Sequence, residues 1–168
     1  MKFLFTITIT LLSISLGWTS DEAVRYNNEI ITEQNKIGEA ILEFSNNPND
    51  FTLLNIKNKG EESLLVLSKI KGFETDKKFI KAAKNLFKFY INISQKEYKE
   101  MLTLLTSGNN FTKEAINKKI KELSGSISKK EKPLDEKFQA AQKEFAKKYN
   151  FELSKNELQE RMKNTNND

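Results

Sequence analysis

The chain of 168 residues contains neither histidine nor cysteine. Nucleophilic triads built on Ser-His or Cys-His pairs need an imidazole, and metal sites with imidazole or thiolate ligands need the same side chains. These classes of active site are therefore excluded. Catalysis by a pair of carboxylates stays open, although close glutamate pairs arise by chance where 30% of the residues are charged. We predict no catalytic residue, no metal ion and no cofactor.

Two polar side chains fall on an apolar helical face near the beginning of the chain. In YNNEIITEQNKIGEAILEF (26–44), apolar residues recur at steps of three and four, as in an amphipathic helix. Tyr26 and Gln34 lie on the same face as Ile30 and Ile37. A phenol and an amide at such positions indicate either a binding site or polar pairs that hold a helical bundle in register.

Three polar residues further along the chain are candidate partners for this pair. Tyr90, Ser94 and Tyr98 belong to a later predicted helix and could meet Tyr26 and Gln34 across a bundle. One interpretation is a layer of hydrogen bonds that satisfies buried polar groups, which is the commoner arrangement. The other is a mostly apolar pocket between helices with a few converging polar groups. These five residues are our candidate ligand-binding set, and the sequence leaves both interpretations open.

A row of lysines marks one side of the same later helix. The spacing of four, three and four residues places them on one ridge of a helix: Lys77, Lys81, Lys84 and Lys88. Such a ridge could contact a polyanion or an anionic surface such as lipid headgroups. The alternative is a solvated helix face, for which lysine is the ordinary residue. We expect a weak contact with an anionic surface at most, and no nucleic acid as a partner.

The first twenty residues, MKFLFTITITLLSISLGWTS, have the layout of a secretory signal peptide. Lys2 precedes a charge-free apolar run, and small residues follow it, with cleavage expected after Gly17 or Ser20. An uncleaved membrane anchor is the alternative, but the run is shorter than the roughly 20 apolar residues of a spanning helix. We predict that residues 1–20 are a signal peptide and that the protein is exported to the periplasm, the medium or the cell surface. Because the chain has no cysteine to acylate, we do not expect a lipoprotein.

The remainder of the chain is predicted to be all-helical, because no sustained period-two alternation indicates a strand. A first helix is expected over about 21–44, ended by the turn sequence SNNPND. A second is expected over about 48–70. In it Gly60 would allow a close backbone approach, and Gly72 would stop the helix.

Two longer helices are expected next. The third runs over about 75–106. The fourth begins at the N-cap Thr112, and its apolar spacing stays in helical phase across SGSISKKEKP (124–133). We therefore expect one long helix bent near Pro133. The alternative is a loop in this stretch that separates two shorter helices.

Four long helices with short connections predict an all-α up-down-up-down four-helix bundle. The bundle is expected to form one domain over residues 21–150. The sequence SKNE (Ser154–Glu157) resembles a capping box that opens a short C-terminal helix. We therefore expect residues 151–168 to comprise this short helix and a disordered tail.

The segment AVRYNNEIITEQNKI, after a leader and before a lysine-rich helical remainder, resembles uncharacterised surface proteins of bacteroidetes and spirochaetes. The likeness lies in Tyr26, Asn27, Ile30, Gln34 and Ile37, together with the general architecture. Many proteins of that group look like lipoproteins, whereas this chain has no cysteine. The resemblance implies an exported helical protein of the cell surface and brings no activity with it.

These observations favour a non-enzymatic exported bundle that acts as a binding or interaction module at the bacterial cell envelope, with a protein or another envelope component as its partner. The alternative is a carrier that holds a small apolar or amphipathic ligand between helices. A carboxylate-based enzyme is the third hypothesis. A fully packed core would favour the module, a pocket the carrier, and two facing carboxylates, one with a raised pKa, the enzyme.

Overall fold

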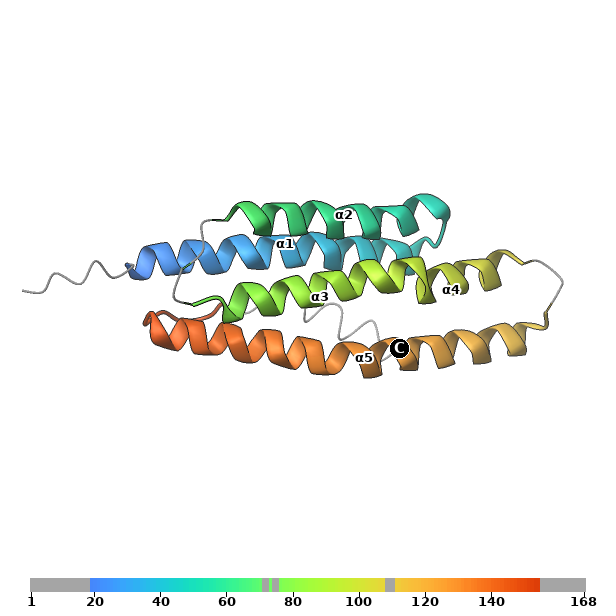
Figure 1. The fold of residues 1–168 in the computed structure, drawn as a ribbon. Helices are drawn as coiled ribbons and strands as arrows, with labels where there is room; N and C mark the ends of the chain where they lie inside the picture. Colours follow the sequence, from blue (N-terminus) through green and yellow to red (C-terminus); the bar gives the residue numbers. More distant parts are fainter. Residues whose placement is uncertain (1–18, 71–72, 74–75, 108–110, 155–168) are drawn as a thin grey trace, which may run out of the picture.

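The computed structural model describes residues 19–70, 73, 76–107 and 111–154, and every regular element in these segments is an α-helix. The all-helical prediction is therefore confirmed. Figure 1 shows the helices lying along a common long axis, with α3 and α4 end to end and α5 alongside both. The helices are, in chain order, α1 (Ser20–Asn46), α2 (Asp50–Lys69), α3 (Lys78–Gln95), α4 (Glu97–Thr106) and α5 (Lys113–Lys148).

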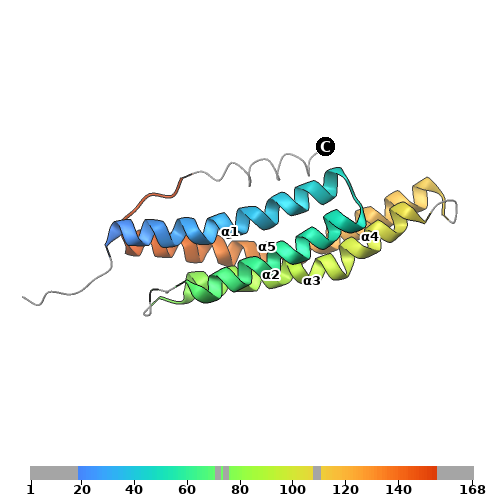
Figure 2. The ribbon, with the colours of Figure 1, turned by 90° about the horizontal axis from the view of Figure 1, so that it is seen from above.

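Each long helix packs against at least two others. α2 packs against α1 and α3, α5 packs against α3 and α4, and α1 makes further contacts with α3 and α5. Figure 2 shows the same assembly from above, with α5 on the far side of α1 and α2. The apolar stripes that the sequence shows along each helix are buried between these neighbours, as amphipathic helices require.

Capping boxes define the starts of α1 and α2. The Thr19 side chain accepts the Glu22 N–H at 3.3 Å, and the Glu22 carboxylate accepts the Thr19 N–H at 2.9 Å. Asn49 and Thr52 form the equivalent pair at α2. Both boxes satisfy N–H groups that a helix start leaves unpaired. The bounds predicted for these two helices are confirmed to within about two residues.

Gly60 lies at a close approach between α2 and α3. A β-carbon at this position would collide with the Cγ1 atom of Ile91 on α3, so the predicted close backbone approach is confirmed. One turn further along α2, the Ser63 hydroxyl donates to the Glu33 carboxylate of α1 at 2.9 Å. α2 is thus tied to α3 by close packing and to α1 by a buried hydrogen bond.

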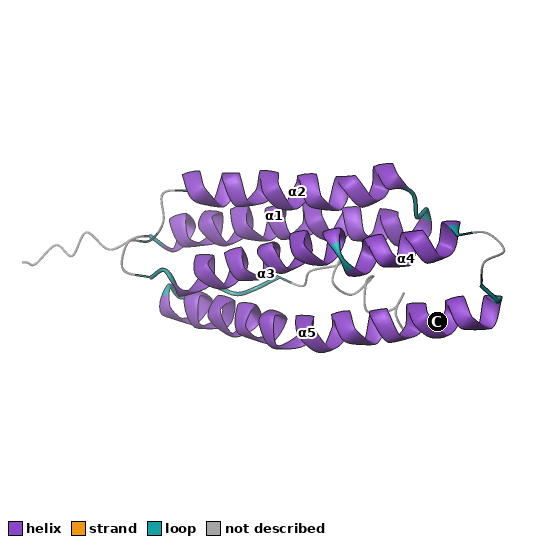
Figure 3. Ribbon diagram, turned by 45° about the vertical axis from the view of Figure 1, so that its right-hand side comes forward, coloured by secondary structure: helices purple, strands orange, loops and turns teal. Residues whose placement is uncertain are grey.

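The third predicted helix is interrupted, so the prediction of one helix over 75–106 is wrong. Lys96 leaves the helical conformation, with φ −122° and ψ −85°, and Figure 3 shows the turn that separates α3 from α4. Immediately after this turn, Glu97 accepts a hydrogen bond from Lys130 of α5 at 2.7 Å. The Tyr98 ring packs on a phenylalanine of α1. The continuous apolar spacing in the sequence does not reveal these tertiary contacts.

α5 is one continuous helix from Lys113 to Lys148, with Pro133 in its interior. Thr112 is its N-cap and accepts the Ala115 N–H at 3.2 Å. The prediction of a single helix across 124–133 is confirmed, and the alternative of a loop there is wrong. Pro133 is exposed, so the carbonyl that its missing N–H leaves unpaired lies on the solvent side of the helix.

One end of the bundle holds a cluster of buried aromatic rings. The Tyr26 ring centroid lies 5.0 Å from that of Phe73, 5.2 Å from that of Phe145 and 6.4 Å from that of Phe79. The three phenylalanines are at most 1% exposed. Aromatic pairs at such distances add to the stabilisation that burial of their area provides. The cluster holds the start of α1 and the end of α5 against α3.

Several predictions lie outside the described residues. These are the signal peptide up to residue 18, the helix stop at Gly72 and the short helix and tail from residue 155 onward. Among the helices of the described segments, none has the combination of length and apolar character that crossing a bilayer requires.

Candidate functional site

A hydrogen bond links the middle of α3 to the middle of α5. The Tyr90 hydroxyl donates to Oε1 of Glu131 at 2.7 Å. Tyr90 is buried and Glu131 is half-buried. Glu131 lies one turn beyond Ile127 and just before Leu134, so it shares the inward face of α5 with these apolar residues. A carboxylate is thus held among apolar side chains with a phenol as its hydrogen-bond donor.

A cleft of about 280 Å³ lies beside this hydrogen bond, with walls from α1, α3, α4 and α5. Its buried floor is apolar and aromatic, and its exposed rim carries serines, a proline and a leucine. The volume lies slightly below the usual range of about 300–1,000 Å³ for small-molecule sites. The lining residues are Ile41, Leu42, Phe44, Ser45, Pro48, Tyr90, Tyr98, Met101, Leu105, Ile120, Ser124, Ile127, Ser128 and Glu131.

Burial raises the pKa of three ionisable side chains that line the cleft, namely Tyr90, Tyr98 and Glu131. It raises the pKa of the Tyr90 and Tyr98 hydroxyls well above the ordinary value, and the charge of Glu131 raises both further. Burial also raises the pKa of the Glu131 carboxyl; the Tyr90 hydrogen bond acts against this rise, and the charge of Asp135 adds to it. The phenols therefore remain protonated donors at neutral pH.

The groups that line the cleft suit binding, and the carboxylate that acts on Glu131 lies on the same helix. Carboxylates that cleave a glycosidic bond stand on opposite sides of it. Asp135, the carboxylate whose charge acts on Glu131, lies one turn away on the same helix and accepts a hydrogen bond from Gln139 at 2.6 Å. The cleft offers phenol donors, a carboxylate acceptor and apolar surface, which are the components of a recognition site.

A second carboxylate near the cleft is already paired. Glu97, at the start of α4, accepts a hydrogen bond from the Lys130 ammonium group at 2.7 Å, and its second oxygen is buried without a partner in the described segments. Burial raises the pKa of Glu97, but the hydrogen bond and charge of Lys130 outweigh it, so that the pKa is lowered. Lys130 is therefore engaged with Glu97 rather than with its sequence neighbour Glu131.

The structure places two of the five predicted ligand-binding residues in the cleft. Tyr90 and Tyr98 line it, whereas Tyr26, Gln34 and Ser94 are not among its lining residues. Tyr26 lies in the aromatic cluster, and its buried hydroxyl has no hydrogen-bond partner in the described segments. Ser94 donates to a carbonyl of its own helix at 2.7 Å, and Gln34 is half-buried on α1. The hydrogen-bond partner of Tyr90 is on α5 and not on α1.

Sequence reasoning missed Glu131. The signal was present, because the apolar stripe of α5 continues through Ile127, Leu134 and Phe138 at helical spacing, and Glu131 interrupts it. The same rule singled out Tyr26 and Gln34 on the first helix. Applied to α5, it identifies a carboxylate on a core-facing stripe, which is rare unless the group has a partner or a function.

The predicted lysine ridge runs along one side of α3. Within the described part of the chain its members form no ion pair, whereas the adjacent Lys78 pairs with Glu144 of α5 at 3.1 Å. One member is half-buried and the other three are exposed: Lys77, Lys81, Lys84 and Lys88. Contact of this ridge with an anionic surface stays a prediction.

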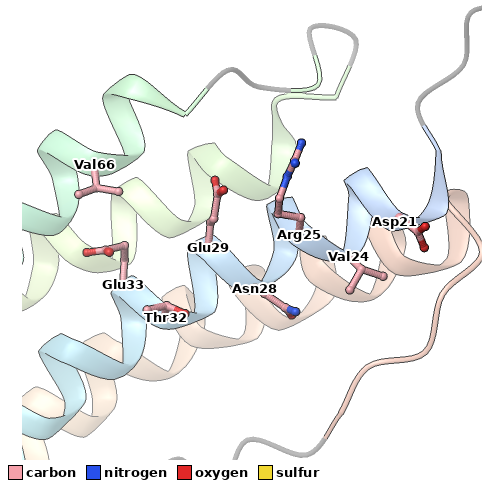
Figure 4. A pocket seen from close by; sticks show the side chains of 8 residues that line it. All are labelled: Asp21, Val24, Arg25, Asn28, Glu29, Thr32, Glu33 and Val66. Atoms are coloured by element: carbon pink, nitrogen blue, oxygen red, sulfur yellow. The ribbon is translucent and has the colours of Figure 1, made fainter.

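A second hollow, of about 490 Å³, lies along the outer side of α1 and reaches Val66 on α2. Figure 4 shows its side chains, including Arg25 and Glu29, fanning outward from α1 instead of converging on a common point. Glu33, at its edge, is already bonded to Ser63 and Lys36. The hollow offers charges of both signs on a mostly exposed surface, so the cleft is the better candidate.

No protein-family model, curated protein or solved structure matches this chain. In the segments that the structure describes, no group of acidic side chains has an arrangement that could hold a metal ion. The candidate site is therefore defined by the geometry of the cleft and by the chemistry of Tyr90, Tyr98 and Glu131.

Proposed function

We propose that this chain is a non-enzymatic binding protein that holds a small amphipathic ligand in the cleft between α1, α3, α4 and α5. The observation that carries the proposal is the convergence of Tyr90, Tyr98 and Glu131 on a cleft that is otherwise mostly apolar. Sites for small molecules combine apolar walls with a few polar groups that fix the orientation of the ligand. The carrier hypothesis is therefore preferred over the interaction module, which a fully packed core would have supported.

The scaffold that we infer is an up-down-up-down four-helix bundle in which α3 and α4 together act as the third helix. The packing of α2 against α1 and α3, and of α5 against α3 and α4, supports this arrangement. Tyr98 lies two residues after the interruption at Lys96 and lines the cleft, so the start of α4 supplies a residue to the site.

The proposed place of action is the bacterial cell envelope. The support is the leader-like segment of residues 1–20, with its lone Lys2 and charge-free apolar run. Cell fractionation and N-terminal sequencing of the protein from its own organism test this part of the proposal. Protein that retains residue 1 in the cytosolic fraction would contradict export without affecting the cleft.

Binding in the cleft is tested with Nile red, a neutral amphipathic dye whose fluorescence rises in apolar surroundings. Ser124 lies on the exposed rim of the cleft, so the substitution Ser124→Phe fills the opening without disturbing the buried floor. Asn117→Phe is the matched control, because Asn117 is exposed on the same helix and does not line the cleft. We expect Ser124→Phe to weaken dye binding about tenfold or more, as loss of a well-fitting apolar contact does, and the control to leave binding unchanged.

Native mass spectrometry of protein purified from its own organism complements the dye experiment. A retained small molecule that is absent from the Ser124→Phe variant would support the proposal. If Nile red binds the two variants and the wild-type chain equally, the cleft is not the binding site and the proposal fails.

A further inference from the structure

Among the described residues, no cationic side chain pairs with the Glu131 carboxylate. Within the described residues, its one hydrogen-bond donor is the neutral Tyr90 hydroxyl, and it forms no ion pair. The charge that acts on it is that of Asp135, which is also negative. A half-buried carboxylate without a cationic partner is unfavourable, because burial removes hydration that nothing else replaces.

No cationic side chain is among the described residues that line the cleft, although lysines are abundant elsewhere in the chain. Lysine and arginine make up 28 of the 168 residues, and α5 itself is rich in lysine. None of the described lining residues is a lysine or an arginine, and Lys130, next to Glu131 in the sequence, is paired with Glu97. The α1 residues that line the cleft are three apolar residues and a serine. The protein is basic, yet its cleft carries a single negative charge.

Aromatic rings surround the same position. Tyr90 and Tyr98 both line the cleft, and Phe44 packs on Tyr98 with ring centroids 5.2 Å apart. The faces of such rings attract ammonium groups, and the attraction grows when the cation is desolvated. Beyond them, Met101 and Ile127 provide buried apolar surface for a hydrocarbon chain.

We propose that the ligand of the cleft is a protonated aliphatic amine, whose ammonium group binds Glu131 among the tyrosine rings and whose hydrocarbon chain lies on the apolar floor. This inference rests on the proposed function and adds the chemical class of the ligand. The ammonium group provides the counter-charge that Glu131 lacks, and it can donate to the carboxylate oxygen that Tyr90 does not engage.

The test compares three probes of equal chain length that differ in charge: n-hexylamine, 1-hexanol and hexanoate. Their binding to the full chain is measured by isothermal titration calorimetry at neutral pH. We expect the amine to bind about tenfold to a hundredfold more tightly than the alcohol, which is the range for a hydrogen bond to a charged group. Hexanoate should bind more weakly than the alcohol, because its charge repels Glu131.

The substitution Glu131→Gln keeps the size of the side chain and an oxygen that can accept from Tyr90. We expect it to abolish the preference for the amine over the alcohol while 1-hexanol still binds. Glu136→Gln is the matched control, since it removes the same charge from an exposed position of the same helix outside the cleft. It should leave the preference intact.

The outcomes separate the two proposals. If 1-hexanol binds the wild-type chain as tightly as n-hexylamine, the amine inference fails while the binding cleft stands. If Glu136→Gln lowers the preference as much as Glu131→Gln does, the selectivity comes from the overall charge and the inference fails. If none of the three probes binds, the amine inference and the proposed function both fail.

Discussion

The Tyr90 hydroxyl donates to Oε1 of Glu131 at 2.7 Å, and this bond joins α3 to α5 across the bundle. It provides the one hydrogen bond that the Glu131 carboxylate receives in the described segments. The bond sits at the edge of the cleft, so its removal affects both the stability of the bundle and the state of the candidate site.

Tyr90→Phe is expected to destabilise the protein by about 1–3 kcal/mol, because a partly buried carboxylate is left without its donor. Urea denaturation followed by circular dichroism measures the change. Tyr98→Phe is the matched control, since the Tyr98 hydroxyl has no hydrogen-bond partner in the described part of the chain. Its effect should stay within about 0.5 kcal/mol. Equal losses in the two variants would contradict a structural role for the Tyr90 bond.

The same substitution at Tyr26 should instead increase the free energy of unfolding. The Tyr26 hydroxyl is buried without a hydrogen-bond partner among the described residues, and the ring is packed among phenylalanines. Burial, with the charge of Asp76 adding to it, raises the pKa of Tyr26 to about 12, so the group is a neutral phenol at neutral pH. Tyr26→Phe removes an unsatisfied polar atom, and we expect a gain of about 1 kcal/mol in the free energy of unfolding. A loss of stability would show that the hydroxyl has a partner.

Glu131 should make the bundle less stable as the pH rises. Burial raises its pKa above the unfolded value, so the folded state holds this proton more tightly than the unfolded state does. The resulting stability is fully present below the unfolded pKa and is lost as the pH rises through the folded pKa. The free energy of unfolding of wild type relative to Glu131→Gln should therefore fall as the pH rises above the ordinary glutamate pKa of about 4.3. Urea denaturation of both proteins below and above this pKa measures the difference.

Glu97 is the control, because its contribution to stability should depend on pH in the opposite direction. Burial raises its pKa, but the hydrogen bond and charge of Lys130 outweigh burial and hold the pKa below the ordinary value. Its stabilising contribution is present above the unfolded pKa and is lost as the pH falls through the folded one. Relative to Glu97→Gln, the wild type should therefore lose stability on acidification. If the two pH profiles have the same sign, the assigned environments of Glu97 and Glu131 are wrong.

The substitution Gly60→Ala should destabilise the protein, although Gly60 lies inside a helix. The new β-carbon would collide with Ile91 of α3, and such overpacking costs about 1–3 kcal/mol. The higher helix propensity of alanine offsets about 1 kcal/mol of this. Gly125→Ala is the matched control, because no atom outside its own helix lies within 4 Å of the position and only the propensity gain remains. Thermal unfolding should show a lower midpoint for Gly60→Ala and a higher one for Gly125→Ala.

The candidate site was only partly predictable from the sequence. Tyr90 and Tyr98 were identified because they are polar residues in an otherwise apolar helical pattern, and both line the cleft. Their expected partners on the first helix, Tyr26 and Gln34, lie elsewhere, since helical periodicity gives the face of a residue and not its neighbour. Glu131 was overlooked, although it interrupts the stripe of α5 by the same rule.

The amino-acid pattern alone was sufficient for the all-helical class, the bounds of the first two helices, the N-cap Thr112, the continuity of α5 through Pro133 and the close approach at Gly60. These features depend on local propensity, on capping side chains and on the period of apolar residues. The turn at Lys96, the bond between Tyr90 and Glu131 and the cleft beside it emerged only from the folded chain. They depend on which helix faces which and at what height. That choice is made by side-chain packing between residues distant in the sequence, which no local pattern encodes.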